Sequence, residues 1–554
     1  MIFKTYFNLS KNILKRNKNL YIPYIITGIF IVVIAFFMDY FASSSFITKL
    51  RGGRTISSTF AFGFFIICIF SLIFLSYTNN FIIKNRFKEL GVFSILGFMP
   101  KDLIFLELIL TLINYFIIVF LGIIFGTLLS KLFFMFVNTS LDMGGTYSFE
   151  LTPILLTAFA FSLIFLIILL LNLFKIIRFN PKKIIEQKSI GELTAKNSKF
   201  LTFLGIFLML GGYIIANLNL NPLDSLPYFF LAVIMVIFGT FLLFSQGLIF
   251  FFKNLKKRED FFYKKKNFIY ISQMIYRIKS NSKGLASICI LLTMAIITIA
   301  FSLGLLNFKN QVMNRIDKDV TFTFVPNKNF NKEKTIKDLK NFLKENNIEI
   351  LQEKISIKKV NYSKDGKKEI DGIFYEFNLK NKEDYKILRN LSSDFSKNIL
   401  KGVELFSYSS KYEMNRAFFY QSGGFLYIGF LLSIIFFAAS IMVMYYKQVS
   451  EGLEDKKNYD ILRKVGMTKE EIKSGINSQV KSIFMLPLIV AICHSFGSLK
   501  IVNGIFNTIF DYSHLESGIY LKSLLIILFL SVLVYIFSYR LTSNVYYKNI
   551  REKI

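Results

Sequence analysis

Side chains that could carry out chemistry are sparse in this sequence of 554 residues. The three cysteines, Cys68, Cys289 and Cys493, each lie within a strongly apolar stretch, and no Cys-x-x-Cys pair is present. Cysteines in such surroundings behave as small hydrophobic side chains. Their odd number and their spacing therefore predict neither a disulfide framework nor a metal site.

Few other ionisable groups fall within the apolar stretches, and this limits the transport chemistry. Glu107, Lys131 and Lys481 lie near the ends of such stretches, where a long side chain can extend to the membrane interface. A carrier driven by protons or ions needs ionisable groups near the middle of the membrane, so that class is disfavoured. His494 could switch its charge with pH, but a hydrogen bond that packs one helix against another is the favoured interpretation.

The sequence contains no motif for nucleotide hydrolysis. It lacks the Gly-x4-Gly-Lys-Ser/Thr loop that cradles phosphates, and it lacks the protein-kinase signatures. The chain is therefore predicted to be a non-catalytic subunit that binds no cofactor of its own. ATP and Mg are expected on a separate ATPase subunit.

Hydrophobic residues make up 53% of the chain and are concentrated in long blocks. About 20 consecutive apolar residues are needed to cross the hydrocarbon core of a membrane as a helix. The expected fold is an all-α polytopic membrane protein with ten transmembrane helices and a small α+β domain. The predicted spans cover residues 21–40, 60–82, 103–130, 152–177, 201–217, 227–252, 285–306, 424–446, 478–499 and 519–539.

The distribution of Lys and Arg predicts the orientation of these spans. The two termini and the segments 83–102, 178–200, 253–283 and 447–475 hold 36 of these residues, against 5 in the short segments on the other side. Cytoplasmic loops are enriched in Lys and Arg, so the basic side and both termini are predicted to be cytoplasmic. This topology accounts for the net charge of +31, and a nucleic-acid partner is not expected.

Two segments next to spans mix apolar and basic residues. Residues 1–19 and 262–283 are predicted to form interfacial helices before spans one and seven. The first apolar run is longer than the ~7–15 residues of a signal-peptide core, so a retained first helix is favoured over a cleaved signal.

The polar segment 308–420 divides the chain into a membrane domain at 1–307, an extracellular domain, and a membrane domain at 421–554. Alternating apolar residues predict strands at 320–325, 355–362 and 370–377, and Asp365-Gly366 predicts a hairpin turn. Helical spacing is found at 334–344 and 383–391. The domain shows no cluster of catalytic residue types.

Two cytoplasmic segments, after spans two and eight, echo each other. In each, apolar residues recur at every third position and a glycine follows, which predicts one apolar helix face and a helix stop. A single face of this kind could lie on the membrane, but two equivalent faces favour docking to a two-fold symmetric partner such as an ATPase dimer. The predicted ATPase-coupling residues are Leu90, Gly91, Phe93, Leu96, Gly97 and Phe98 in the first segment and Tyr459, Leu462, Val465, Gly466 and Met467 in the second.

Further motifs accompany these segments: Lys15-Arg-Asn17, Lys88-Glu-Leu-Gly91, Ile95-Leu-Gly97, Leu462-Arg-Lys-Val-Gly-Met467, Leu486-Pro-Leu488 and His494-Ser495. Together with a large domain between spans seven and eight, they resemble the FtsX-like ABC transporter permeases of the ten-helix bacitracin-export type. The resemblance covers essentially the whole chain.

The resemblance implies a cell-membrane permease, driven by an ATPase dimer, that confers resistance to antimicrobial peptides by mechanotransmission. It also implies a membrane sensor histidine kinase as a partner, and a peptide antibiotic or its complex with a lipid carrier as the target. The extracellular domain is about half the size that is common in this family, which leaves the peptide specificity open.

Two other functions remain open on the sequence. One is a signalling module that controls a partner kinase or an envelope hydrolase, and the other is a permease that moves lipids or lipoproteins. Residues 308–420 contain 23 Lys and Arg against 16 Asp and Glu. This positive field favours contacts with an anionic lipid head group or with a peptide–lipid complex over contacts with a free cationic peptide.

Overall fold

The computed structural model describes residues 2–45, 47, 53–141, 146–178, 198–218, 225–263, 265–326, 332–361, 369–381, 384–385, 387–388, 403–464, 469–510 and 518–551. The chain forms two compact units. The first comprises Met1–Gly304 together with Phe425–Ile554, and the second comprises Leu305–Gly424.

The first unit is helical throughout its described parts and matches the predicted membrane class. In the described residues, nine helices are long and apolar enough to cross a membrane. A further pair, Lys481–Gly497 and Leu499–Phe506, meets the same criteria and is bent by 43°, which gives ten spans if the pair is one span. A polytopic protein with ten spans is therefore consistent with the structure.

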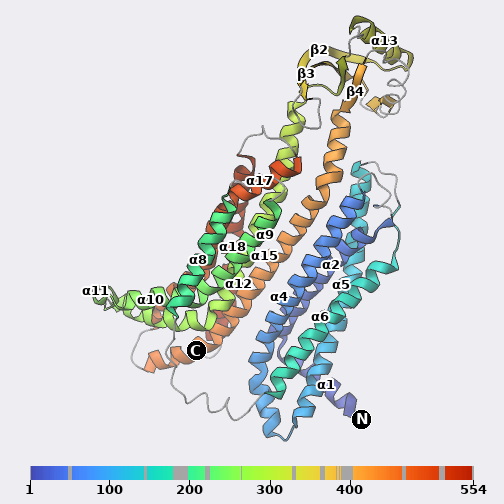
Figure 1. The fold of residues 1–554 in the computed structure, drawn as a ribbon. Coiled ribbons are helices and arrows are strands. Elements are labelled where there is room, and N and C mark those ends of the chain that lie inside the picture. Colours follow the sequence, from blue (N-terminus) through green and yellow to red (C-terminus); the bar gives the residue numbers. More distant parts are fainter. Residues whose placement is uncertain are drawn as a thin grey trace. The chain divides into compact units, whose positions relative to one another are not determined.

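Four long helices and one short helix form the N-terminal bundle (Figure 1). Helix α2 packs against α4 and α5, and α6 packs against α2, α4 and α5. The short first helix lies against the fourth element of the bundle, α5. The elements are α1 (Ile2–Arg16), α2 (Lys18–Ser43), α4 (Gly53–Ile95), α5 (Pro100–Leu141) and α6 (Leu151–Ile177).

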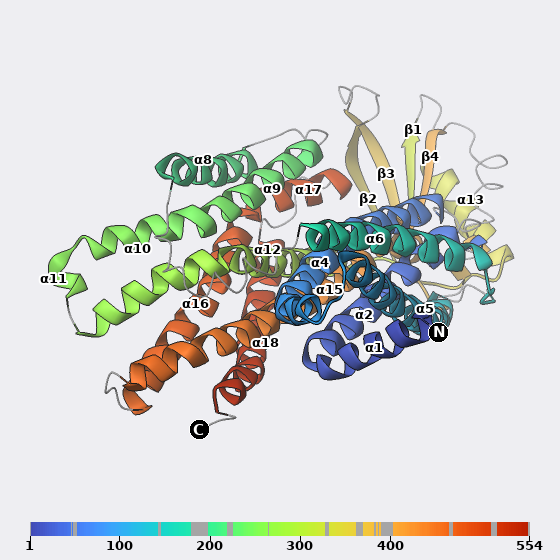
Figure 2. The same ribbon diagram turned by 90° about the horizontal axis from the view of Figure 1, so that it is seen from below.

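The other helices of this unit include a tightly packed pair, α8 and α9, which Figure 2 shows side by side. A π-helical turn, η2, joins α9 to α10, and this rod ends at α11 (Figure 2). The bounds are α8 (Lys199–Ala216), α9 (Ser225–Leu242), η2 (Leu243–Gly247), α10 (Leu248–Lys256), α11 (Glu259–Phe262), α12 (Lys265–Arg315), α15 (Lys411–Lys464), α16 (Lys469–Gly497), α17 (Leu499–Phe510) and α18 (Ile519–Arg551).

Several helices extend beyond the apolar stretches that predict them. The predicted interfacial helix at 262–283 is wrong as a separate element, because α12 runs without a break from Lys265 to Arg315. Neither proline nor a left-handed glycine interrupts this stretch, so the helix continues into polar sequence. By contrast, α1 does end before the first span, and Asn17 separates it from α2. Part of the predicted outer loop 500–518 is helical and belongs to α17.

The second unit is a small α+β domain, as expected. Its antiparallel sheet has the strand order β2-β3-β1-β4, and the three predicted strands are present. The fourth strand, β4, was missed. The predicted Asp365-Gly366 turn and most of the predicted helix 383–391 lie outside the described residues. The bounds are β1 (Val320–Pro326), α13 (Lys332–Glu345), β2 (Ile350–Asn361), β3 (Glu369–Leu379) and β4 (Val403–Ser410).

Alternation along the strands and helical spacing along α13 build the core of this domain. In β1, Val320, Phe322 and Phe324 point to one face, and all three are buried. Leu339 and Leu343, one turn apart on α13, are buried in the same cluster. Burial of these large apolar side chains is the main stabilising term for so small a domain.

The base of the domain ties its sheet to the start of α15. The backbone amide of Lys411 donates to the carbonyl of Asp319 (2.8 Å), and the ammonium of Lys411 donates to the carbonyl of Ile316 (3.0 Å). The Asp319 carboxylate accepts from the Leu379 amide (3.1 Å) and from the Tyr412 hydroxyl (3.5 Å). Because β4 ends at Ser410 and α15 begins at the next residue, the strand passes directly into the helix.

We predict that Asp319→Ala loosens this base. The variant loses two hydrogen bonds to a charged acceptor, a cost of roughly 2 kcal/mol. Limited proteolysis of the full-length protein in detergent should then cut within residues 305–424 at least ten-fold faster. Asp317→Ala is the control, because Asp317 is exposed. Equal cutting rates for the two variants would contradict the assignment.

A second prediction concerns Glu353, which accepts hydrogen bonds from Lys340 (2.6 Å) and from Tyr375. These bonds, that of Lys340 foremost, lower the pKa of Glu353. A carboxylate with a lowered pKa stabilises the fold above its unfolded pKa, and this contribution is lost as the pH falls through the folded pKa.

Glu353→Gln should therefore lower the domain's unfolding temperature at pH 7 but reduce the further loss on acidification below about pH 5. The unfolding temperature is measured at several pH values, with susceptibility to proteolysis as the signal of unfolding. Glu345→Gln is the matched control, because Glu345 is exposed on the same unit. Parallel pH profiles for wild type and Glu353→Gln would show that the prediction is wrong.

Candidate functional site

The turn between α4 and α5 contains the first set of predicted coupling residues. Helix α4 ends at Ile95, and Gly97 follows with φ of 96°. The amide of Phe98 donates to the carbonyl of Phe93 (3.0 Å), and that of Gly97 donates to the carbonyl of Ser94 (3.2 Å). This pair of bonds is a Schellman motif, and glycine suits its left-handed position. The rings of Phe93 and Phe98 pack across it with centroids 5.2 Å apart.

The start of α5 is fixed equally firmly. Pro100 occupies the first helical position, where its missing N–H has no cost. The Asp102 carboxylate accepts from the amide of Met99 (2.8 Å), which caps the helix. It also accepts from the Tyr6 hydroxyl of α1 (2.7 Å). The turn is therefore held by hydrogen bonds on both sides.

Four apolar side chains at this turn are nevertheless exposed on the surface of the chain. Val92, Ile95, Leu96 and Met99 are 54%, 70%, 70% and 67% exposed. We call these four residues the apolar tip. Large apolar side chains gathered at a rigid turn are typical of a surface that is covered by a partner.

The structure divides the predicted residues of this segment into two groups. Leu90 is buried in a cluster with Ile83, Leu103 and Ile176, and Phe93 and Phe98 pack against that cluster. Leu96 alone of the predicted apolar stripe belongs to the exposed tip. The predicted short helix is in fact the last turns of the long helix α4, and Leu90 and Phe93 of its i, i+3 face point into the bundle. Gly91 has open space around it.

The second segment is described only in part. Tyr459 and Leu462 lie on α15, which ends at Lys464. Val465, Gly466 and Met467 lie outside the described residues. The structure therefore shows the backbone helix that leads into this segment and not the predicted glycine stop.

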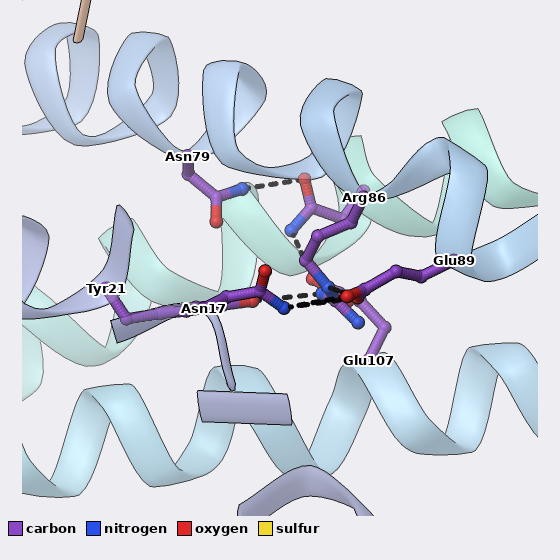
Figure 3. Close-up of polar contacts among 7 residues, drawn as sticks. Asn17, Tyr21, Asn79, Arg86, Glu89 and Glu107 are labelled. Atoms are coloured by element: carbon purple, nitrogen blue, oxygen red, sulfur yellow. Dashed lines mark hydrogen bonds and ion pairs between the residues drawn. The ribbon is translucent and has the colours of Figure 1, made fainter. Parts of the chain in front are cut away.

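Directly beneath the tip, a buried ion pair joins α4 to α5. Arg86 Nη1 lies 2.9 Å from Glu107 Oε2, and the two side chains are 1% and 5% exposed. The same Nη1 donates to the Tyr21 hydroxyl of α2 (3.0 Å). Figure 3 shows these groups meeting between the helices.

Hydrogen bonds extend this pair into a network of seven residues (Figure 3). The other oxygen of Glu107 accepts from Asn172 of α6 (3.0 Å), and Asn172 accepts from Asn79 of α4 (2.7 Å). On the exposed side, Arg86 Nε lies 3.8 Å from Glu89, and Asn17 donates to Glu89 (3.1 Å). The network thus links α2, α4, α5, α6 and the junction of α1 with α2.

Sequence reasoning placed two of these residues wrongly. Glu107 was expected to reach the interface, yet it is 4% exposed and paired with Arg86. Arg86 was counted among the cytoplasmic loop cations, yet it is fully buried. One signal was available: Arg86 lies between Ile83 and Leu90 on the apolar face of a helix, where a charge needs a partner.

His494 has the packing role that was favoured for it. Its ring lies between Tyr213 of α8, which bonds Nδ1, and Thr240 of α9, which bonds Nε2 (3.0 Å). Thr240 already donates its one hydroxyl proton to the carbonyl of Val236 (2.6 Å). We therefore assign the proton to Nε2, so that Nδ1 accepts from Tyr213. The imidazole thus joins α16 to α8 and α9.

A further buried acid, Asp39, escaped notice in the sequence. It is 2% exposed, and it accepts from Thr157 of α6 (3.0 Å) and from Ser43 (3.4 Å). It lies toward the C-terminal end of α2, far along the helix from Tyr21. Within the described part of the chain, no group of three or more His, Cys, Asp and Glu side chains could hold a metal ion.

We predict that the buried ion pair tolerates joint replacement better than single replacement. Glu107→Leu or Arg86→Met alone leaves one unpaired buried charge, which costs roughly 3–5 kcal/mol. The double variant removes both charges, so it should regain at least half of the lost thermal stability in detergent. Glu89→Gln is the control, because Glu89 is 22% exposed and should cost less. If the loss of thermal stability in the double variant equals the sum of the losses in the two single variants, the pairing is contradicted.

Comparisons with known proteins agree with this architecture. A model of the FtsX-like permease C-terminal family matches residues 60–181, the segment that contains Arg86, Glu107 and Asn172. The ABC transporter permease protein YxdM of Bacillus subtilis is 24% identical over 88% of this chain and 91% of its own length.

Two bacitracin export permease proteins named BceB are also similar. That of Halalkalibacterium halodurans is 30% identical over 41% of this chain and 37% of its own length. That of Bacillus subtilis is 23% identical over 88% of this chain and 92% of its own length. The chain is therefore homologous to ABC transporter permeases, including bacitracin export permeases, carries an FtsX-like permease segment at residues 60–181, and is a multi-pass protein of the cell membrane.

Proposed function

We propose that the chain is the membrane subunit of an ATP-driven complex and that a separate ATPase dimer docks at the apolar tip and at the segment 459–467. The observation that carries this proposal is the apolar tip itself. Four exposed apolar side chains stand on a turn that is closed by a Schellman motif and capped by Asp102. Such a tip can enter a groove of a partner without first having to be ordered.

The buried network supports a mechanical role for this tip. Arg86 and Glu89 lie within the last three turns of α4, and their partners belong to the neighbouring elements of the bundle. A push on the tip would therefore move α2, α5 and α6 with α4. In this mechanism, ATP with Mg is bound by the partner, and the permease converts the motion of the ATPases into movement of its helices.

Helix α15 supplies the second connection. It leads into residues 459–467 at one end, and β4 of the α+β domain passes directly into it at the other. The proposal therefore assigns α15 the role of a stalk that carries motion from the ATPases to an extracellular domain at 308–420.

For the target, we propose a cell-wall-directed antimicrobial peptide, free or bound to its lipid carrier, and hence a function in resistance. The similarity to two bacitracin export permease proteins supports this choice. The positive balance of residues 308–420 favours the anionic lipid part of such a complex as the contact. A sensor histidine kinase is proposed as an additional membrane partner.

Ile95→Asp combined with Leu96→Asp should uncouple the permease without unfolding it, because both side chains are exposed. Burial of one such side chain in a partner contributes about 1.5–3 kcal/mol, so the amount of co-purified ATPase should fall at least ten-fold. In a strain whose only copy carries this variant, sensitivity to bacitracin-like and cationic peptides should rise to that of a deletion strain.

Tyr263→Asp is the matched control, because Tyr263 is 69% exposed and lies beside α11, away from the tip. It should leave ATPase binding and resistance intact. The proposal fails if the tip variant still binds the ATPase, or if a deletion strain is as resistant as the parent.

A further inference from the structure

A proline opens the hydrogen-bond ladder of the first span. Pro23 lies within α2, beyond its first turn, and has no N–H to donate. The carbonyl four residues earlier, that of Asn19, therefore loses its partner within the helix. In a membrane protein such carbonyls are satisfied by neighbouring helices.

Two consecutive tyrosines of α15 fill this position. The Tyr445 hydroxyl donates to the carbonyl of Asn19 (3.2 Å), and the Tyr446 hydroxyl donates to the carbonyl of Leu20 (2.7 Å). Two side chains of α15 thus hydrogen-bond to the backbone of α2 just before Pro23.

The position of Tyr446 is fixed from several sides. Its side chain is 1% exposed, and its ring packs against Phe81 of α4 with centroids 5.0 Å apart. Tyr21, one residue after the Leu20 carbonyl, belongs to the network of Arg86. The contact between α15 and α2 therefore lies next to the network that holds the apolar tip.

The same local geometry recurs elsewhere in the chain. Pro487 lies within α16, and the Tyr535 hydroxyl of α18 donates to the carbonyl of Phe484 (2.6 Å), three residues before the proline. Leu20 stands three residues before Pro23 in the same way. This bond joins α18 to α16 and does not involve α15. Tyr535 is therefore a matched control, because its hydroxyl also donates to a carbonyl three residues before a proline.

We propose that Tyr445 and Tyr446 are positioning residues that latch the stalk helix α15 onto α2 and so couple the two cytoplasmic segments of the permease. We call these two residues with Pro23 the tyrosine latch. Motion of the first segment passes through the Arg86 network to α2, and the latch passes it to α15. This role in coupling rests on the proposed function, whereas the latch itself can be tested without it.

The structural test is a double-mutant cycle in the purified full-length permease. Tyr445→Phe with Tyr446→Phe removes only two hydroxyls and should lower the unfolding temperature. Pro23→Ala restores an amide that can donate to the Asn19 carbonyl, so the part of this loss that comes from Tyr445 should disappear in that background. An equal loss in both backgrounds would overturn the latch.

The functional test uses the permease and its ATPase reconstituted in lipid nanodiscs, with bacitracin as the stimulating peptide. The double tyrosine variant should keep the bound ATPase and the basal hydrolysis rate. Its peptide-stimulated rate should fall at least about three-fold, the change that a typical hydrogen bond between membrane helices gives. Pro23→Ala in the same chain should not restore stimulation, because the new amide satisfies the Asn19 carbonyl within α2 and leaves α15 without its two hydrogen bonds.

Tyr535→Phe should lower thermal stability to a similar extent and leave stimulation at the wild-type level. Full stimulation in the double tyrosine variant, or an equal fall in Tyr535→Phe, would overturn the coupling role. If the wild-type complex shows neither ATPase binding nor stimulation, the proposed function fails, while the double-mutant cycle still decides the latch.

Discussion

The ion pair between Arg86 and Glu107 constrains the rest of the first bundle. Both groups are almost completely buried, and an unpaired charge in such a place would be strongly destabilising. The pair therefore has to persist in every conformation that the bundle adopts. Because Tyr21 and Asn172 bond to the same two side chains, α2 and α6 are bound to this requirement as well. The consequence is a block of helices that are joined at the end where α4 meets α5.

The described part of the chain shows which features the sequence could predict. Long apolar stretches predicted the spans, because one helix crosses the membrane by its own composition. The stop at Gly97 was equally accessible, since the two bonds of a Schellman motif join residues no more than five positions apart. Asn347 ends α13 in the same way, with φ of 57° and a bond from the Ile348 amide to the Leu343 carbonyl (2.9 Å). Signals of this kind are local, so one stretch of sequence contains them completely.

The misplaced features depend on contacts between distant residues. From hydropathy alone, the second span was predicted to end before Arg86. The helix in fact continues to Ile95, and the bundle buries the Arg86 guanidinium. Strand β4 departs from strict alternation at Leu405-Phe406 and is defined by its pairing with β1, whose residues lie some eighty positions earlier. The Leu90 face followed a correct helical period, but nothing in that period tells whether α6 or a partner covers it. Side-chain pairing across helices decides these cases.

The Arg86–Glu107 pair and the tyrosine latch differ in strength, and this difference indicates which of the two contacts breaks first. Breaking the Arg86–Glu107 pair costs roughly 3–5 kcal/mol, whereas each tyrosine hydroxyl in the latch contributes on the order of 1 kcal/mol. In the mechanism that we propose, a load at the apolar tip therefore separates α15 from α2 before it disrupts the bundle. Relative motion of the stalk is then confined to a place where Pro23 has already opened the backbone and where hydroxyls can exchange partners. A strong block joined to a weaker latch lets one helix move by a small step while the helices beside it keep their packing.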